Sequence, residues 1–342
     1  MKRTASYLPG FVLALTIAAI SKFLEGLLPI HSIGASVIAL FLGMGVNHFH
    51  KPGKTLKPGL AFTSKKVLKF AIVLLGASLS IGTILHIGRL SLTVMVFTLL
   101  TCFGGGYFVG RALKLNWKLS NLISAGTGIC GGSAIAAIAP VIDAEDRDIA
   151  YAISATFLFD MAMIVLFPMM GRALGLSDMA YGLWAGTAVN DTSSVVAAGY
   201  TFSEAAGDFA TMVKLTRTLS IIPTVIIFAL IHVHLKRKAA AAAGGEQEIH
   251  AQVSVSKIFP WFILMFIALA LFNSTGLIPV RLSSGLKDLS KFLMVAALAA
   301  IGLNTDFKEM KRSGFTPMVH GFIISLLVVI VAIAVEFCMG LV

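Results

Sequence analysis

The strongest candidate for chemistry in this sequence is an aspartate placed inside an apolar segment. Asp191 lies in WAGTAVNDTSSVVAAGY (184–200) and is followed by hydroxyl residues. A carboxylate at the centre of a membrane span costs about 2.5–3.5 kcal/mol to insert, so it faces protein or water and is a functional candidate by default. It could bind a proton or Na⁺ there. The alternative is a helix N-cap before Thr192, a role that suits Asp and is compatible with the first.

A second apolar segment repeats this pattern without the charge. SAGTGICGGSAIAAIAP (124–140) and the segment around Asp191 both contain Ala-Gly-Thr, a variable pair, a Ser and an Ala/Val run. Two copies of one polar interruption are hard to explain as packing, so we predict that both contribute to one site. The alignment pairs Thr127 with Thr187, Cys130 with Asn190, Gly131 with Asp191 and Ser133 with Ser193.

Glycine makes the first copy a poor continuous helix. Four glycines fall within residues 126–132, and each weakens a helix by about 1 kcal/mol relative to alanine. Non-helical backbone at membrane depth is tolerated only inside protein or beside water. The pattern therefore favours two half-helices that meet at a binding site, as in many secondary transporters. The alternative is a continuous helix whose small residues allow close packing.

A helix break offers ligands for ions of both signs. The N-terminus of a half-helix beginning near Gly132 would attract an anion, and the C-terminus of one ending near Thr127 would attract a cation or a proton donor. Cys130 is interpreted as a small packing residue rather than a redox group. The predicted substrate and ion site consists of Thr127, Gly128, Cys130, Gly131, Gly132, Ser133, Thr187, Asn190, Asp191, Thr192 and Ser193.

Three further charged residues lie inside apolar segments. Asp160 is at the middle of TFLFDMAMIVLF, and Lys214 and Arg217 share one helix face. The two basic residues either extend their long stems to the membrane surface, or they attract an anionic substrate and neutralise an aspartate. We predict a coupling or charge-balancing role for the set Asp191, Asp160, Lys214 and Arg217.

Membrane-spanning helices would position these residues. The sequence is 57% hydrophobic and 13% charged with a mean hydropathy of +0.91, whereas a soluble domain averages about 25% charged residues. The basic residues sit in short loops, so the net charge of +11 does not indicate nucleic-acid binding. A crossing needs about 20 apolar residues. We predict an all-α polytopic membrane protein with eleven spans, near 8–28, 32–49, 67–87, 90–111, 119–142, 149–173, 178–200, 209–235, 257–277, 284–304 and 316–340.

Basic residues orient this array. The positive-inside rule places the N-terminus, the lysine-rich segment 50–66, Arg172 and Lys236 in the cytoplasm. The same rule places the acidic connector 143–148 and the C-terminus outside.

Two further features concern organisation. The polar segment 236–256 is predicted to be a mobile cytoplasmic linker between spans 1–8 (1–235) and spans 9–11 (257–342). KFAIVLLGASLSIGTIL (69–85) resembles KFLMVAALAAIGLNTDF (291–307) in two spans of opposite direction, as an inverted repeat requires. The two glycine- and aspartate-containing segments would cross in the same direction, which such a repeat does not explain.

The interrupted segments resemble those of a known family. GTGICGGSAIAAIAPVI (126–142) and GLWAGTAVNDTSSVVAAG (182–199) are similar to the signature stretches of YeiH-type sulfate exporter membrane proteins, and the likeness covers nearly the whole chain. That family is placed by similarity with the sodium/proton antiporter and bile-acid symporter architecture. The resemblance implies a panel domain and a core domain with crossed discontinuous helices, with spans three to five in the core.

We therefore expect a secondary active transporter of the inner membrane. Its substrate would be a small anion, of the sulfate or organic sulfonate class by resemblance, and Asp191 would carry the coupling H⁺ or Na⁺. The first alternative is a monovalent cation/proton antiporter that uses Asp191 and Asp160. The second is an intramembrane enzyme or sensor, which no catalytic or metal spacing supports. We expect no enzyme activity, no cofactor beyond the coupling ion and no bound metal. The expected partners are the anion and the lipid bilayer, and a homodimer stays open.

Overall fold

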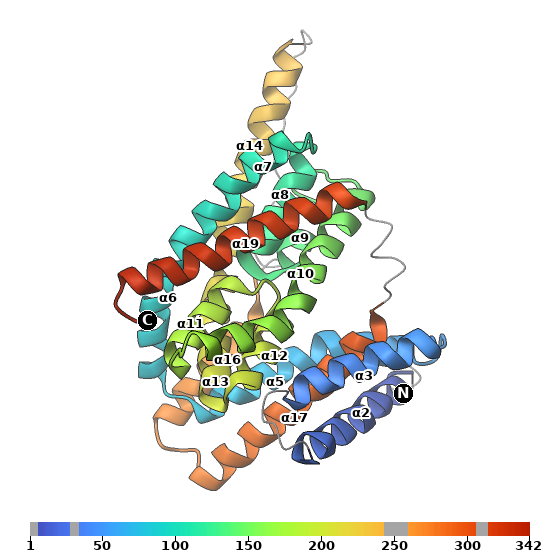
Figure 1. The fold of residues 1–342 in the computed structure, drawn as a ribbon, viewed down its shortest axis with the longest axis vertical. Helices are drawn as coiled ribbons and strands as arrows, with labels where there is room; N and C mark the ends of the chain where they lie inside the picture. The colour runs from blue at the N-terminus through green and yellow to red at the C-terminus, as the bar shows by residue number, and fades with distance from the viewer. Residues whose placement is uncertain (1–5, 28–33, 243–258, 306–313) are drawn as a thin grey trace.

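The protein is described here by a computed structural model that covers residues 6–27, 34–242, 259–305 and 314–342. Every regular element in those ranges is a helix (Figure 1). The α-helices, in chain order, are α2 (Leu8–Leu27), α3 (Ala35–Phe49), α4 (Lys57–Phe62), α5 (Leu68–Leu75), α6 (Ile81–Leu100), α7 (Gly106–Ala112), α8 (Trp117–Ala125), α9 (Gly132–Ile138), α10 (Asp146–Ala173), α11 (Asp178–Ala188), α12 (Thr192–Phe202), α13 (Glu204–Leu219), α14 (Ile221–Ala242), α16 (Trp261–Ser274), α17 (Val280–Asn304) and α19 (Phe315–Cys338).

Short segments of π-helix or 3-10 helix continue some of these α-helices without a break. The π-helical turns are η1 (Thr63–Val67), η3 (Thr101–Gly105) and η4 (Gly126–Cys130), and η2 (Gly76–Ser78) is a 3-10 turn. Such π turns often occur at functional sites. In the described residues, five helical stretches are long and apolar enough to cross a membrane, at 8–27, 81–112, 146–173, 204–237 and 315–338.

The helices form two bundles (Figure 1). The first, called the scaffold bundle below, contains α2, α3, α4–η1–α5, α16 and α17, with α17 packed along α3 and α5. The second, called the hairpin bundle, contains α6–η3–α7, α8–η4, α9, α10, α11, α12, α13, α14 and α19. Each bundle therefore combines segments that are far apart in the sequence, and the predicted segment 257–342 contributes α16 and α17 to one bundle and α19 to the other.

Two predicted boundaries in the N-terminal half are wrong. The third and fourth helical stretches run from 57 to 78 and from 81 to 112, so the chain bends at Leu79–Ser80 rather than after residue 87. Ser80 is the N-cap of α6 and fixes where that helix begins, because its hydroxyl accepts a hydrogen bond from the N–H of Thr83. The lysine-rich segment 50–66 is therefore helical from Lys57 onward. Since α5 packs on α16 and α17, the third span also lies outside the bundle that holds the interrupted helices.

The segment predicted as span 119–142 is a helical hairpin and not a crossing. Its two halves, α8–η4 and α9, are separated by Gly131 and pack against each other. Lys118 Nζ donates a hydrogen bond of 2.5 Å to the Asp143 carbonyl, so the chain leaves on the side where it entered. We call residues 117–138 hairpin 1.

The segment predicted as span 178–200 is also a hairpin. The Tyr181 hydroxyl donates to the Ala198 carbonyl at 3.0 Å, and the Tyr181 ring stacks on Phe202 with ring centroids 3.9 Å apart. At the open end, the Ser203 hydroxyl donates to the Asp178 carboxylate at 2.6 Å. We call residues 178–202 hairpin 2. Its sequence is rich in small residues, which lets the two short helices approach closely.

The hairpins enter the molecule from opposite sides. The 28-residue helix α10 connects the open end of hairpin 1 to that of hairpin 2, and at about 1.5 Å per residue it spans roughly 40 Å. We name the two sides by residues at their surfaces. The Lys236 side carries the open end of hairpin 1, since Lys236 Nζ lies 2.6 Å from the Asp143 carboxylate. The Glu204 side carries the open end of hairpin 2.

This arrangement corrects the predicted sidedness of two connections. The connector 143–148 lies on the same side as Lys236, not opposite to it, and Arg172 lies on the Glu204 side, where it donates to the Thr201 carbonyl at 2.8 Å. Because both segments turn back, the parity of crossings is unchanged after residue 202, so the two errors do not alter the prediction for the other connections. The predicted linker 236–256 begins inside α14, which continues to Ala242, and residues 243–256 lie outside the described ranges.

Candidate functional site

The tips of the two hairpins touch at the centre of the hairpin bundle. Gly131 adopts φ +63°, a conformation that favours glycine, and a Cβ atom built on it would lie 3.0 Å from the Cβ and from Oδ1 of Asp191. The glycine is thus required both by its backbone angle and by the close approach of hairpin 2. The predicted breaks at 126–133 and 187–193 are confirmed as breaks, with their ends in contact.

A buried carboxylate accepts hydrogen bonds from the free backbone N–H groups at the tip of hairpin 2. Asp160, at the middle of α10, accepts hydrogen bonds from the N–H groups of Asn190 and Asp191, each at 2.9 Å. These N–H groups precede α12 and have no partner within that helix. A carboxylate at a helix N-terminus is stabilised by the partial positive charge there. Asp160 is fully buried, and these two hydrogen bonds join the middle of α10 to the tip of hairpin 2.

Two buried cations, Lys214 and Arg217, donate hydrogen bonds to backbone carbonyl groups on the other side of each break. Arg217 donates to the carbonyls of Thr127 and Gly128, both at 2.6 Å, and to that of Val189 at 3.3 Å. Lys214 donates to the Val189 carbonyl at 2.9 Å. The C-terminal ends of η4 and α11 carry partial negative charge, which these cations offset. Both side chains are buried, so they do not extend to a membrane surface, and neither lines the cavity described below.

Asp191 caps a helix and faces open space at the same time. Its carboxylate accepts a hydrogen bond of 2.9 Å from the N–H of Ser193 and a short one from the Ser193 hydroxyl. The predicted N-cap is therefore confirmed. The side chain is only partly buried and lines a cavity.

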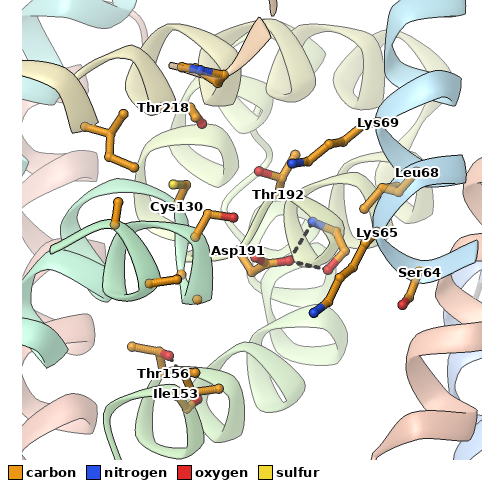
Figure 2. Close-up of a pocket in the computed structure, with 18 of the residues that line it drawn as sticks. Ser64, Lys65, Leu68, Lys69, Cys130, Ile153, Thr156, Asp191, Thr192 and Thr218 are labelled. Carbon is orange, nitrogen blue, oxygen red and sulfur yellow. Dashed lines mark hydrogen bonds between the residues drawn. The ribbon is translucent and has the colours of Figure 1, made fainter. Parts of the chain in front are cut away.

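The cavity lies between the two bundles and ends on the hairpin tips (Figure 2). Its volume is about 1260 Å³, enough for a small ligand with water. The parts of α10 and α17 that line it, at 153–160 and Ile301, belong to the halves of these helices on the Lys236 side, and so do Phe259, Pro260 and Phe262 at the start of α16. The cavity therefore extends from the tips toward the Lys236 side.

Two lysines on the scaffold bundle form the wall opposite the tips. Lys65 of η1 and Lys69 of α5 line the cavity, and Figure 2 shows both extending from that helix toward Asp191 and Thr192. Neither was predicted from the sequence as a site residue, since Lys65 was assigned to the loop 50–66 and Lys69 was used only as the first residue of the repeat segment 69–85. The available signal was the i, i+4 spacing in KKVLKF, which places both on one helix face.

The predicted site residues divide between this cavity and the protein interior. Thr187 bonds back to the Leu183 carbonyl at 2.7 Å and stays inside α11. The side chains of Thr127 and Asn190 turn toward α19, where their polar atoms lie 3.4 and 3.3 Å from the Ser325 hydroxyl. Ser325 was not predicted. The predicted residues that line the cavity are Cys130, Gly131, Gly132, Ser133, Asp160, Asp191, Thr192 and Ser193.

Comparison with known proteins gives a family but no activity. A family model described as conserved hypothetical protein 698 matches residues 9–321. A UPF0324 membrane protein of Clostridium tetani is 56% identical over 337 residues, covering 98% of each chain. A UPF0324 membrane protein of Streptococcus agalactiae is 40% identical over 342 residues, covering 97% of this chain and 98% of the relative. One of Streptococcus mutans is 38% identical over 342 residues, covering 98% of each.

These matches extend over both bundles, both hairpins and the lysine-bearing helix. They agree with the several long apolar helices and with the apolar composition. The chain is therefore a membrane protein that belongs to the conserved hypothetical protein 698 family, together with these UPF0324 membrane proteins.

Proposed function

We propose that this protein is a secondary active transporter of a small anion, of the sulfate or organic sulfonate class, coupled to H⁺ or Na⁺. The observation that carries the proposal is the cavity between the bundles, which ends on two opposed hairpin tips and has Lys65 and Lys69 on its facing wall. Interrupted helices beside a cavity are typical of secondary transporters. The sulfate class rests on the family resemblance of the two interrupted segments.

The balance of charge around the cavity favours an anion. Lys65, Lys69, Asp160 and Asp191 line it, and Lys214 and Arg217 lie behind the tips with their charges directed at carbonyls. The wall itself carries two lysines and two carboxylates, and the two cations behind the tips are offset only by the partial charges of carbonyl groups, so the six groups together are net positive. In a partly desolvated cavity an unbalanced charge is unfavourable, so a small anion between the lysines and the tips would restore neutrality.

Asp191 is the group we propose to carry the coupling ion. Of the two carboxylates on the cavity wall, Asp160 is fully buried and accepts two backbone N–H groups, whereas Asp191 is partly exposed and its hydrogen bonds from Ser193 both go to Oδ2. A proton or Na⁺ on Asp191 would change the charge that the anion meets. No cofactor, metal or enzymatic step enters this cycle.

Access would alternate by movement of one bundle against the other. The anion would lie at their interface, with the lysines on one bundle and the tips on the other. If the positive-inside rule holds, the Lys236 side is cytoplasmic, the cavity opens to the cytoplasm, and the N- and C-termini lie in the cytoplasm and outside respectively, in an inner membrane.

A monovalent cation/proton antiporter is the second candidate. It is favoured by the two neighbouring aspartates, since the Asp160 carboxylate accepts the N–H of Asp191 at 2.9 Å. In that case Lys65 and Lys69 would be dispensable, because they would repel the substrate cation. The lysines therefore separate the two candidates.

Transport by purified protein in liposomes tests the proposal. We expect uptake of sulfate or a small organic sulfonate under an imposed proton or Na⁺ gradient, and a loss of at least about tenfold in the variant Lys65→Gln/Lys69→Gln. Lys66→Gln is the matched control, because Lys66 is exposed on the same helix but does not line the cavity. Cation/proton exchange that persists in the double variant, with no anion uptake by the wild type, would establish the antiporter instead.

A further inference from the structure

The two lysines of the cavity have a counterpart elsewhere in the chain. KKVLKF (65–70) and KDLSKF (287–292) both place lysines four residues apart, with phenylalanine directly after the second. The match aligns Lys65 with Lys287 and Lys69 with Lys291. Residues four apart on a helix share a face, so α17 presents two lysines on one face, with the same spacing as Lys65 and Lys69.

The two helices that carry these pairs lie side by side and run in opposite directions. The Ser290 hydroxyl donates to the Ala71 carbonyl at 2.6 Å, and the Ser283 hydroxyl donates to the Ala77 carbonyl at 2.9 Å. Higher numbers on α17 thus meet lower numbers on the 57–78 helix. Lys69 and Lys291 therefore lie at nearly the same depth, Lys65 lies toward the Lys236 side, and Lys287 lies toward the Glu204 side.

The pairs differ in what faces them. Lys65 and Lys69 face the cavity, whereas Lys287 Nζ lies 2.6 Å from the Asp208 carboxylate and Lys291 Nζ lies 2.7 Å from that of Glu204. The pairs share an aromatic neighbour, since Lys69 lies 5.4 Å from the Phe262 ring centre and Lys291 lies 6.0 Å from that of Tyr200. On the Glu204 side the lysine pair is thus occupied by carboxylates of the protein itself, whereas on the Lys236 side the corresponding lysine pair faces an open cavity.

We propose that Lys287 and Lys291 form a second anion-binding site, which serves the conformation open to the Glu204 side and is filled here by the carboxylates of Asp208 and Glu204. The ligand is the same class of small oxyanion that the proposed function assigns to the cavity, on which this inference rests. Each lysine pair would bind the anion in one of the two access states.

The contacts that fill this site cross the interface between the bundles. Lys287 and Lys291 belong to the scaffold bundle, and Glu204 and Asp208 belong to α13 of the hairpin bundle. Any movement that opens the Glu204 side separates them. The Glu204 side chain is 73% exposed, so its ion pair is weak and breaks easily. Asp208 is held more firmly, because it also accepts a hydrogen bond of 2.7 Å from the Tyr200 hydroxyl.

Removing the carboxylate charges should release the lysines without removing any lysine. In purified Glu204→Gln/Asp208→Asn protein, we expect a water-soluble amine-reactive ester to modify Lys287 and Lys291 roughly tenfold faster than in the wild type, as loss of two partly exposed ion pairs implies. Exposed Lys66 should react equally in both proteins and serves as the control. The modification is measured residue by residue by mass spectrometry. Glu204→Gln alone, at the more exposed position, should show the same effect at Lys291 and guards against misfolding of the double variant.

Protection by anions tests binding. Sodium sulfate, with methanesulfonate and phosphate as further probes, should slow modification of Lys287 and Lys291 in the variant, while sodium chloride at equal ionic strength should not. Unchanged reactivity in the variant, or faster reaction that none of these oxyanions slows, would overturn the second site. Labelling requires no transport, so the two proposals fail separately. Protection without any anion uptake in liposomes would remove the transporter function, and uptake that depends on Lys65 and Lys69 without protection would remove only the second site.

Discussion

The two hairpins share one architecture and carry different chemistry at their tips. In each, a helix ends at a break and a second helix returns along the first, and Arg217 donates a hydrogen bond to a carbonyl at the end of the first half of both. The tip of hairpin 1 consists of small residues around Gly131, whereas the tip of hairpin 2 carries Asn190 and Asp191. One tip thus supplies space and the other supplies charge.

This difference explains why the tips can meet. A side chain at residue 131 would collide with Asp191, so the charged tip fits only against a bare one. The aligned positions Gly131 and Asp191 are therefore complementary and not equivalent. A break that binds ions needs room for the ligand as well as groups that hold it, and here the two copies divide these tasks.

The largest expected effect comes from replacing Arg217, which donates hydrogen bonds to both hairpins. Arg217→Gln leaves the carbonyls of Thr127 and Gly128 without the donor that they have here, and an unpaired buried polar group costs about 1–3 kcal/mol. We expect a loss of about 3–5 kcal/mol in unfolding free energy, measured by SDS titration of the purified protein. Lys214→Gln is the comparison variant, because the Val189 carbonyl keeps Arg217 as a donor at 3.3 Å, so its loss should be smaller. Equal losses would contradict a bridge by Arg217.

Gly131 tests the difference between the tips. Gly131→Val introduces a branched side chain at φ +63° and against Asp191, and backbone strain of this kind costs about 1–3 kcal/mol. We expect lower stability together with loss of anion uptake in liposomes, since the tips can no longer meet. Gly132→Ala is the control for the fold, because a Cβ there has no heavy atom within 4 Å. A Gly131→Val protein with wild-type stability and uptake would mean that the tips need not touch.

The sequence was informative about the breaks and about Asp191, because both depend on local chemistry. Glycine density disfavours a helix whatever surrounds it, and an Asp followed by Thr-Ser-Ser favours a helix N-terminus in any context. The half-helices begin at Gly132 and Thr192, in agreement with the predicted starts. The sequence also indicated that Asp160 would be buried against a partner, because a charged residue in the middle of a span requires one.

The direction of each half-helix after its break could not be read in the same way. A hairpin and a crossing have the same hydropathy, and the positive-inside rule tests only the parity of crossings, which two hairpins leave unchanged. The acidic connector 143–148 looked external for that reason. Lys65 was missed because its helix begins at Lys57, ten residues before the predicted apolar run, and Lys69, at the start of that run, was not recognised as its partner on the same helix face.

Asp191 tests whether charge at the second tip does more than cap a helix. Asp191→Asn keeps an acceptor oxygen for the N–H of Ser193, so stability should change by about 1 kcal/mol or less. Uptake driven by a proton or Na⁺ gradient should stop, because the amide cannot titrate, while exchange of anion for anion persists. The comparison variant is Asp160→Asn, which offers one acceptor where two N–H groups now bind and should be the less stable protein. Accumulation by Asp191→Asn with wild-type ion dependence would leave Asp191 only a cap.

The open ends of the hairpins give the smallest and most selective test. Hairpin 1 is tied by charge, since the Asp143 carboxylate lies 2.6 Å from Lys236 Nζ and 3.1 Å from His232 Nε2. Hairpin 2 is tied by the hydrogen bond from the Ser203 hydroxyl to Asp178. Hydrogen bonds from Lys236 and His232 lower the pKa of Asp143 below its usual value. A carboxylate whose pKa is lowered by folding stabilises the protein above the unfolded-state pKa of about 3.9 and loses that contribution as pH falls through the lower folded-state value.

We therefore expect Asp143→Asn to cost at most about 1 kcal/mol near pH 7, because the carboxylate is largely exposed and screened by water. The cost should shrink at high salt and vanish at acidic pH, where the wild-type carboxylate is also neutral. Amide hydrogen exchange in residues 139–145, followed against pH and salt, measures it locally. Asp178→Asn should show no comparable salt dependence, since Ser203 is an uncharged donor and the amide still offers an oxygen. An equal salt response at both ends would mean that the two hairpins are anchored by the same kind of interaction and differ only at their tips.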